Sequence, residues 1–301
     1  MRISPETSQI LLNALNASDR AEQAALQQMS TGKRVNQASD DPAAAAMEVD
    51  IAAQMDGCDQ YLRSIGSLSS ELQTTDSSLN SVVTALQRAI TLGTEGANGT
   101  MSSQDRETLA EEVKGIAQQV LGVANLSYNG HYVFAGTADA EPPYVADDNG
   151  NITYQGNDAV NTVEVETGQS VAVNQPGSAL FSATGANVFQ ALNNLVTEMQ
   201  DPSTTTDDIG NATTAVRTAY DQLNSARSFY GSTLDQLQSS QDFLNSEQVQ
   251  LSSQQDSTIG ADLNTAAANL TSAEEARNAA VQAAASMNGM TLMDYISPAT
   301  A

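Results

Sequence analysis

Apolar residues recur in heptads along two long stretches of the chain. In the first stretch, steps of four and three residues from Ile51 to Ile90 meet an apolar residue at ten of twelve positions. This spacing predicts one straight coiled-coil seam on a long helix from about Ala43 to Leu92. We expect Cys58, which lies in the seam, to be a small buried hydrophobe. The twelve positions are Ile51, Met55, Cys58, Leu62, Ile65, Ser69, Leu72, Asp76, Leu79, Val83, Leu86 and Ile90.

The second stretch has a strict period of seven and predicts another long helix. Shorter apolar patterns predict a helix over 109–123 that Ser102 and Asp105 could cap, and one over 188–199 that ends before Asp201-Pro202. Together these patterns predict a mainly α protein, an elongated helical bundle or coiled-coil rod. The period-seven positions are Ile209, Val216, Leu223, Tyr230, Leu237, Leu244 and Leu251.

Both ends of the chain carry weaker seams, made mainly of alanine. Such seams bury little area per turn, so they stabilise a lone helix pair only weakly, but they let helices approach closely. We therefore expect the ends to be mobile in the free monomer and to become ordered against other chains. The positions expected to form this polymer interface are Ile10, Ala14, Ala17 and Ala21 near one end, and Ile259, Leu263, Ala266, Leu270 and Ala273 near the other.

The middle of the chain has a different pattern. Residues 130–185 are rich in Gly, Val, Thr, Asn and Tyr, which is typical of strands and turns. A tight hairpin is expected at Asp148-Asn149-Gly150-Asn151, because Asn-Gly is the commonest pair in such turns. The sequence thus predicts a helical protein with a small inserted β domain.

Composition excludes several classes of function. The chain has 36 acidic and 11 basic residues and a net charge of −25, so the backbone of a nucleic acid or an anionic membrane face would repel it. One cysteine cannot form an intrachain disulfide, and one histidine with one cysteine leaves no Cys/His zinc site. The longest early apolar run, Ile10–Leu12, is far shorter than a signal peptide requires, so we expect no cleavable signal.

Three patterns that suggest chemistry have simpler explanations. Thr31–Arg34 lacks the first glycine and the Ser/Thr of a phosphate loop. A calcium loop over 147–158 would place Ile152 where the sharp turn needs glycine. His131 has no acidic or serine neighbour at a known catalytic spacing. We therefore expect no catalytic residue, no bound cofactor and no metal site, and hence no enzyme.

Asp40-Asp41-Pro42 predicts a bend before the first long helix, because proline suits the first helical position and an aspartate can cap it. The segment Met29–Ala43 around this bend resembles the N-terminal signature of the flagellin family, with Thr31 and Val35 as modest departures. The opening Met1–Ser4 and the ending Leu292–Ile296 are also similar to that family. The motif residues at the bend are Gly32, Lys33, Arg34, Asn36, Asp40, Asp41 and Pro42, and the resemblance adds Leu292 and Tyr295 to the polymer interface.

Within the family, the middle of the chain resembles the members that join hook to filament. The residues that carry this resemblance are Tyr132, Phe134, Gly136, Tyr154 and Gly156. The family's usual acid after Tyr-x-Gly is absent, since Asn157 stands there, so we infer no metal binding from that position.

The resemblance implies a layered structure. Paired N- and C-terminal helices, 1–41 with 258–301, would form a polymerisation domain; 42–129 with 186–257 would form a helical rod; and 130–185 would form the outer β-rich domain. The resemblance also implies self-assembly at the hook–filament junction, with a neighbouring hook-associated junction protein, the flagellin filament and an export chaperone as partners. Export would follow the flagellar type III route, so the protein would be extracellular.

Two other functions remain open on the sequence. The chain could be the flagellin filament subunit itself, although the Tyr132–Gly136 segment and the single short insertion favour the junction. It could also be a cytosolic coiled-coil signalling protein of the chemoreceptor type, which would lack the β insertion.

Overall fold

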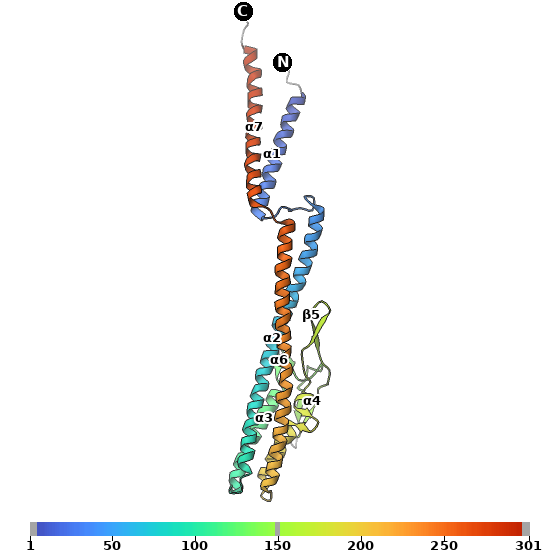
Figure 1. Ribbon diagram of the computed structural model, residues 1–301, viewed down its shortest axis with the longest axis vertical. Coiled ribbons are helices and arrows are strands. Elements are labelled where there is room, and N and C mark those ends of the chain that lie inside the picture. The colour runs from blue at the N-terminus through green and yellow to red at the C-terminus, as the bar shows by residue number, and fades with distance from the viewer. Residues whose placement is uncertain (1–4, 148–150, 297–301) are drawn as a thin grey trace, which may run out of the picture. The chain divides into compact units, whose positions relative to one another are not determined.

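Long helices occupy both ends of the chain, and short strand pairs occupy its middle (Figure 1). The computed structural model describes residues 5–147 and 151–296, with the side chains of 5–8 and 286–296 left out of that description. The helices are α1 (Pro5–Thr31), α2 (Pro42–Gly96), α3 (Ser103–Ala124), α4 (Gly177–Leu180), α5 (Val188–Gln200), α6 (Thr206–Ile259) and α7 (Leu263–Ile296). The chain divides into two compact units: unit 1 combines Met1–Gly57 with Ser246–Ala301, and unit 2 is Cys58–Asn245.

The two heptad stretches become the two longest helices, as predicted. All seven period-seven positions of α6 are buried, from Ile209 to Leu251. Along α2, burial recurs every seven residues from Ile51 to Leu86. No helix among the described residues is long and apolar enough to span a membrane.

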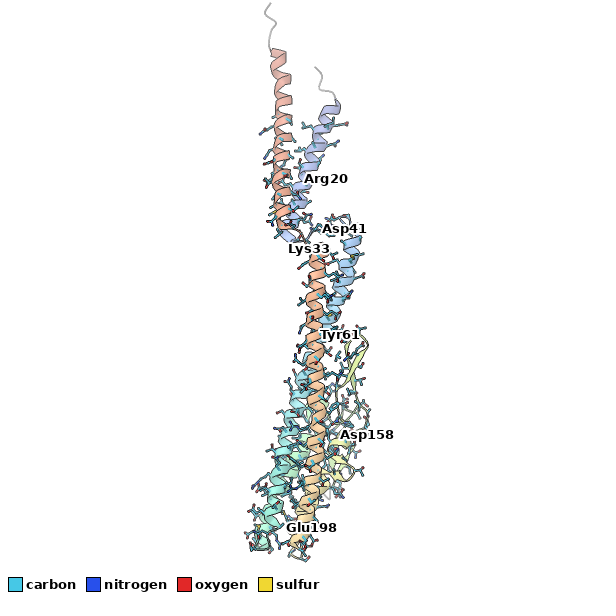
Figure 2. All side chains as sticks on the ribbon, in the orientation of Figure 1. Arg20, Lys33, Asp41, Tyr61, Asp158 and Glu198 are labelled. Atoms are coloured by element: carbon cyan, nitrogen blue, oxygen red, sulfur yellow. The ribbon has the colours of Figure 1, made fainter. Side chains whose placement is uncertain are left out.

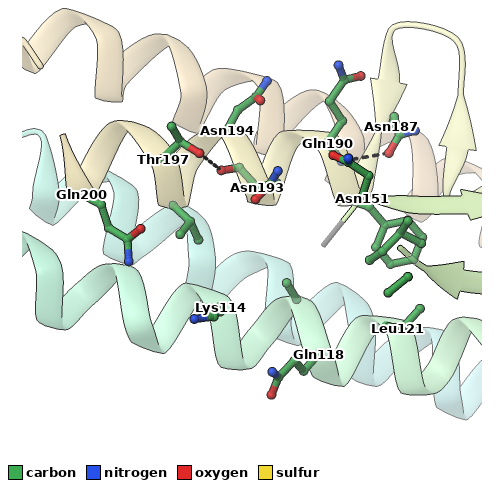
Figure 3. A pocket seen from close by; sticks show the side chains of 15 residues that line it. Lys114, Gln118, Leu121, Asn151, Asn187, Gln190, Asn193, Asn194, Thr197 and Gln200 are labelled. Carbon is green, nitrogen blue, oxygen red and sulfur yellow. Dashed lines mark hydrogen bonds between the residues drawn. The ribbon is translucent and has the colours of Figure 1, made fainter. Parts of the chain in front are cut away.

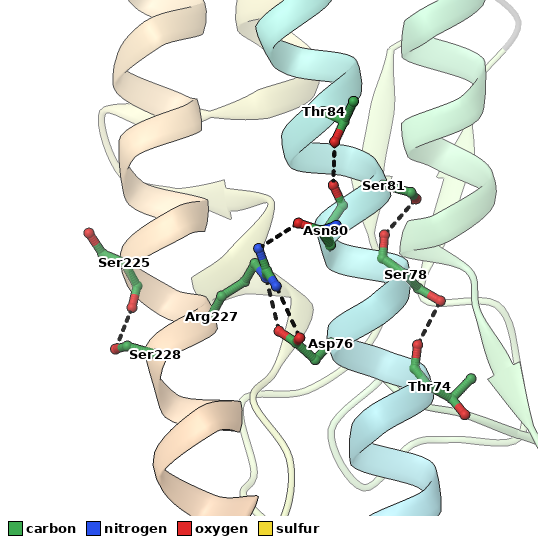
Figure 4. A network of polar contacts seen from close by, with 9 residues as sticks. All are labelled: Thr74, Asp76, Ser78, Asn80, Ser81, Thr84, Ser225, Arg227 and Ser228. Carbon is green, nitrogen blue, oxygen red and sulfur yellow. Dashed lines mark hydrogen bonds and ion pairs between the residues drawn. The ribbon is translucent and has the colours of Figure 1, made fainter.

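Asp76, a polar residue in the α2 seam, is explained by a partner on α6. Arg227 donates from Nε to Asp76 Oδ1 at 2.9 Å and from Nη2 to Asp76 Oδ2 at 3.0 Å (Figure 4). Its third nitrogen, Nη1, donates to Asn80 Oδ1 at 3.0 Å. The Arg227 side chain is only 21% exposed. The break in the apolar pattern is therefore the site of a two-pronged ion pair within unit 2.

Helices α3 and α5 begin and end close to the positions that the sequence predicts. The Ser102 side chain accepts a hydrogen bond from the Asp105 N–H, so α3 has the expected N-cap. Asn187 caps α5 in the same way, through the Gln190 N–H, and α5 ends at Gln200, directly before Asp201.

In the described part of the middle of the chain, the strands form four two-stranded antiparallel sheets. They pair β1 (Ser127–Tyr128) with β2 (His131–Tyr132), β3 (Tyr144–Ala146) with β4 (Ile152–Tyr154), β5 (Thr162–Glu166) with β6 (Gln169–Ala172), and β7 (Ser182–Ala183) with β8 (Ala186–Asn187). β3 and β4 pair on either side of the turn expected at Asp148–Asn151, with Ala146 opposite Ile152. Residues 148–150 of this turn lie outside the described residues.

An aromatic cluster forms the core of this middle region. The Phe181 ring meets Phe134 edge-on at 5.3 Å between centroids and meets Tyr144 edge-on at 5.8 Å. Tyr144 also lies 5.0 Å from Phe189 at the start of α5. Edge-to-face packing of this kind stabilises a core beyond the area that it buries. The cluster therefore attaches the small hairpins, which are too short to be stable alone, to the helices of unit 2.

Candidate functional site: the bend and the paired terminal helices

The bend motif forms a short connection between α1 and α2 in unit 1 (Figure 2). Gly32 ends α1 with a left-handed backbone (φ +69°) and donates its N–H to the Gln28 carbonyl at 2.9 Å. Glycine adopts this conformation without the steric cost that other residues meet, and it commonly ends helices. Gly32 therefore stops α1 and turns the chain toward α2.

The bend is hydrogen-bonded to the break between α6 and α7. The Arg34 N–H donates to the Ile259 carbonyl at 2.6 Å, and the Ala261 N–H donates to the Gly32 carbonyl at 2.8 Å. Lys33 and Gly260 thereby form an antiparallel bridge. Backbone hydrogen bonds thus connect residues that lie more than 200 positions apart in the sequence.

Arg34 strengthens this closure with its side chain. Its Nη2 donates to the Thr258 carbonyl at 2.9 Å and to Asp41 Oδ2 at 3.2 Å. A planar guanidinium can serve both acceptors at once, which a lysine ammonium does with less geometric definition. Arg34 therefore links the end of α6 to the start of α2.

The two aspartates of the motif have separate tasks. Asp41 Oδ1 accepts from the Ala44 N–H at 3.1 Å and caps α2. This backbone hydrogen bond, followed by the one from the Arg34 side chain, lowers the pKa of Asp41. Asp40 Oδ2 instead accepts from the N–H groups of Asn36 and Gln37, at 3.0 and 2.9 Å, and closes the turn before the helix.

A second polar link and a small apolar cluster complete the bend. Lys33 Nζ and Gln255 Nε2 both donate to Glu48 Oε1, at 3.2 and 2.9 Å. Val35, Ala44 and Ile259 are buried together in one small cluster. Ile259, one of the expected polymer-interface residues, is therefore packed within its own chain.

Helix α1 has two different faces. α1 lies beside α7 (Figure 1). Among the described side chains of α1, those that are wholly or partly buried are Leu11, Leu15, Ser18, Asp19, Glu22, Ala25 and Gln28. Ile10, Ala14, Ala17 and Ala21 lie on another face and are exposed, Ile10 by 67%. The expected interface residues of α1 are thus left uncovered by the chain itself.

In helix α7, unlike α1, most of the expected interface residues whose side chains are described are buried or partly buried. Ala266 and Ala273 are buried and Leu270 is partly buried, whereas Leu263 is 54% exposed. Leu292 and Tyr295 lie in α7, but their side chains are outside the described part of the chain.

An ion-pair cluster joins α1 to α7, and the seam pattern alone did not identify it. Arg277 interrupts the alanine seam of α7, and its Nε lies 3.1 Å from Asp19 Oδ1. Its Nη1 lies 3.4 Å from Glu22 Oε2. The signal in the sequence was a pair of acids three residues apart, Asp19 and Glu22, which share one face of a helix.

The outer motif is held by hydrogen bonds around one tyrosine. Tyr154 Oη lies 3.0 Å from the Phe134 carbonyl and 2.9 Å from the Asn157 carbonyl. A side chain on Gly136 would run into the Asn157 carbonyl, and one on Gly156 would run into the Tyr154 ring. Tyr132 adds a backbone link from its N–H to the Asp139 carbonyl at 2.9 Å. The motif residues therefore shape one compact turn cluster.

The single histidine of the chain has an acidic partner in the structure. His131 Nδ1 lies 3.0 Å from Asp139 Oδ2, but its side chain is largely exposed. Within the described ranges, no three His, Cys, Asp or Glu side chains gather as metal ligands would. What the geometry supplies is a closed bend and an uncovered helix face.

Residues 6–139 match the family described as the bacterial flagellin N-terminal helical region. Flagellar hook-associated protein 3 of Salmonella typhimurium is 32% identical over 162 residues, which are 54% of this chain and 50% of that protein. The Escherichia coli protein of the same name is 30% identical over 190 residues, 58% of this chain and 59% of that protein. Flagellin D of Vibrio anguillarum is 29% identical over 137 residues, 45% and 36% of the two chains. This chain therefore spans about half the length of the curated relatives it matches.

Solved structures share the fold over a larger part of the chain. A protein described as hook-associated from Vibrio parahaemolyticus aligns with a TM-score of 0.69 and 22% identity, covering 73% of this chain and 100% of that one. Hook-associated protein 3 of Legionella pneumophila aligns with a TM-score of 0.60 and 16% identity, covering 75% and 98%. At these identities the alignments establish the fold.

Proposed function

Because this chain carries the flagellin-family N-terminal helical region and has the fold of hook-associated proteins, we propose that it is a structural subunit of the bacterial flagellum. It self-assembles at the hook–filament junction and connects hook to filament. Its mechanism is interface geometry, with no catalytic step, cofactor or metal.

The uncovered face of α1 is the observation that carries this proposal. A helix that pairs with α7 through one face and leaves Ile10, Ala14, Ala17 and Ala21 exposed has a surface left for other copies. Small side chains let neighbouring helices approach closely, so this face suits repeated helix–helix contacts. The closed bend supports the same function, because it separates this terminal pair from the helices that follow.

Further parts of the proposal rest on the resemblance. The terminal segments 1–41 and 258–301 serve polymerisation, 42–129 with 186–257 form the rod, and 130–185 form the outer domain. The partners are other copies, a neighbouring hook-associated protein, the flagellin filament and an export chaperone. The protein reaches the outside of the cell through the flagellar export apparatus.

Deleting the gene tests the junction role. We expect the deletion to leave hooks without filaments and to release intact filament subunits into the medium, and we expect the wild-type gene to restore attachment. Electron microscopy of the hooks and immunoblots of the medium measure both results. Hooks that keep their filaments would rule out the junction role, whereas bare hooks without released subunits would identify the chain as the filament subunit.

A further inference from the structure

A groove of about 680 Å³ lies between α3 and α5 in unit 2 (Figure 3). Polar side chains of α5 line one wall, among them Gln190, Asn193 and Asn194. Lys114 and Gln118 of α3 line the other wall. Leu121 and Phe189 contribute apolar surface at one end. The volume falls within the range of ligand pockets in proteins.

The groove is free of carboxylates although the chain is strongly acidic. Of the 15 residues that line it, Lys114 alone is charged, whereas the whole chain has 36 acidic residues. Glu111 lies at the rim, where its Oε1 is 3.8 Å from Lys114 Nζ and accepts from Gln200 Nε2 at 3.3 Å. The lining is thus a neutral, amide-rich strip with one cation on it.

The amides in the groove are available for new contacts. Gln190, Asn193 and Asn194 are exposed. Within the described residues, their side-chain amides and that of Gln118 make no hydrogen bond to the rest of the chain. Each amide can donate and accept at once, so it can pair with a similar group on another surface. The hydrogen bonds drawn along this wall of Figure 3 involve the Asn187 cap and the Thr197 hydroxyl.

We propose that this groove is a docking surface for a second copy of the same chain, which extends the self-assembly proposed above and rests on it. Two chains of charge −25 repel each other, and like charges that face each other in an interface weaken binding. A second copy therefore approaches most readily where carboxylates are absent. Lys114 offers that acidic partner one attractive contact, and the amides offer uncharged hydrogen bonds.

A concave surface also suits the geometry of a ring or helical assembly. A groove is not complementary to itself, so it contacts a different surface of the neighbouring copy. Such head-to-tail contacts produce rings and helices, whereas self-complementary contacts produce closed pairs. The groove therefore provides one half of a contact that can be repeated from copy to copy.

Photo-crosslinking in assembled flagella tests this docking surface. A benzoylphenylalanine at Gln190 should give a cross-linked product that contains two copies of this chain. Adding Asn193→Glu and Asn194→Glu should lower its yield about tenfold, because two new carboxylates face an acidic neighbour. The matched control carries Asn224→Glu and Gln236→Glu, which are exposed on α6 away from the groove, and should leave the yield unchanged.

The other possible results of the cross-linking experiment would contradict the proposed docking surface. No cross-link, a cross-link only to a different protein, or an equal yield with and without the two glutamates would overturn the groove as a contact between copies. Circular dichroism and urea unfolding should show both double variants folded like the wild type, since all four positions are exposed. If gene deletion removes filaments but these results fail, the groove inference is wrong and the junction role stands.

Discussion

At the scale of single residues, the amide of Asn157 stands where the resembled Tyr-x-Gly pattern has an acid, and it makes three hydrogen bonds. Its Oδ1 accepts from the N–H groups of Thr137 and Ala159, at 3.0 and 3.1 Å. Its Nδ2 donates to Thr137 Oγ1 at 2.8 Å. A carboxylate could accept the first two hydrogen bonds but could not donate the third. Asn157 thus organises the turn cluster through its amide, a role that the sequence did not indicate.

Gly136 makes the same cluster sensitive to one methyl group. Its backbone is left-handed (φ +73°), and a Cβ there would meet the Asn157 carbonyl. We expect Gly136→Ala to lower the free energy of unfolding by about 2–4 kcal/mol, combining the left-handed strain with overpacking. The matched control is Gly122→Ala in α3, where a Cβ meets nothing within 4 Å. It should raise stability by about 0.5–1 kcal/mol. Urea unfolding measures both, and equal effects would contradict the role of Gly136.

At the scale of elements, the helices could be predicted from the sequence better than their contacts. In α2 and α6, large apolar residues such as leucine occupy the heptad positions, and serine and glutamine are common between them. The buried faces of these two helices can therefore be predicted from periodicity. Helix α1 lacks this contrast. Two of its faces repeat in steps of four and three, one through Ile10, Ala14 and Ala17 and the other through Leu11, Leu15 and Ser18. Alanine is small enough to be buried or exposed at little cost, so periodicity could not decide which face meets α7.

The partners of side chains that pair over long sequence distances could likewise not be predicted from the sequence. Asp76 is visible as a break in the α2 seam, but nothing near it in sequence indicates Arg227. Periodicity places a residue on a face and leaves open which residue of another helix stands opposite.

The Asp76–Arg227 pair gives a prediction about how α2 and α6 hold together. Asp76→Leu makes the seam apolar at this position but leaves a largely buried guanidinium, whose other side-chain partner among the described residues is Asn80. We expect a loss of about 1–3 kcal/mol, below the cost for a fully buried pair because both side chains keep some solvent contact. The double variant Asp76→Leu with Arg227→Leu should recover most of that loss. Thermal unfolding of the single and double variants measures the coupling, and additive effects would show that the two side chains act independently.

At the scale of the whole molecule, the described surface includes faces without carboxylates although the chain as a whole is acidic. The exposed alanine face of α1 and the amide groove of unit 2 both lack carboxylates, although the chain is strongly acidic. High net charge keeps separate copies soluble. In the proposed assembly, neutral surfaces then determine where copies can meet.

Ala17→Glu separates assembly from folding. Ala17 is exposed on the α1 face that does not contact α7, so the variant should unfold within about 0.5 kcal/mol of the wild type. In cells that lack the natural gene, it should fail to restore filament attachment, because a carboxylate enters the proposed contact between copies. Gln23→Glu, also exposed on α1 but on neither the Ala17 stripe nor the α7-facing stripe, should restore attachment. Attachment counted by electron microscopy decides between them, and normal attachment with Ala17→Glu would exclude this face as an interface.

Unit 1 is assembled from both ends of the chain, with the whole of unit 2 between them in sequence. Contacts between such distant segments carry the largest loop-closure cost and form slowly. When the chain emerges in sequence order, α1 precedes the whole of unit 2, and α7 follows it. The Leu11–Ala25 stripe therefore remains without its partner until unit 2 has emerged, and pairing of α1 with α7 shows that unit 2 has already passed.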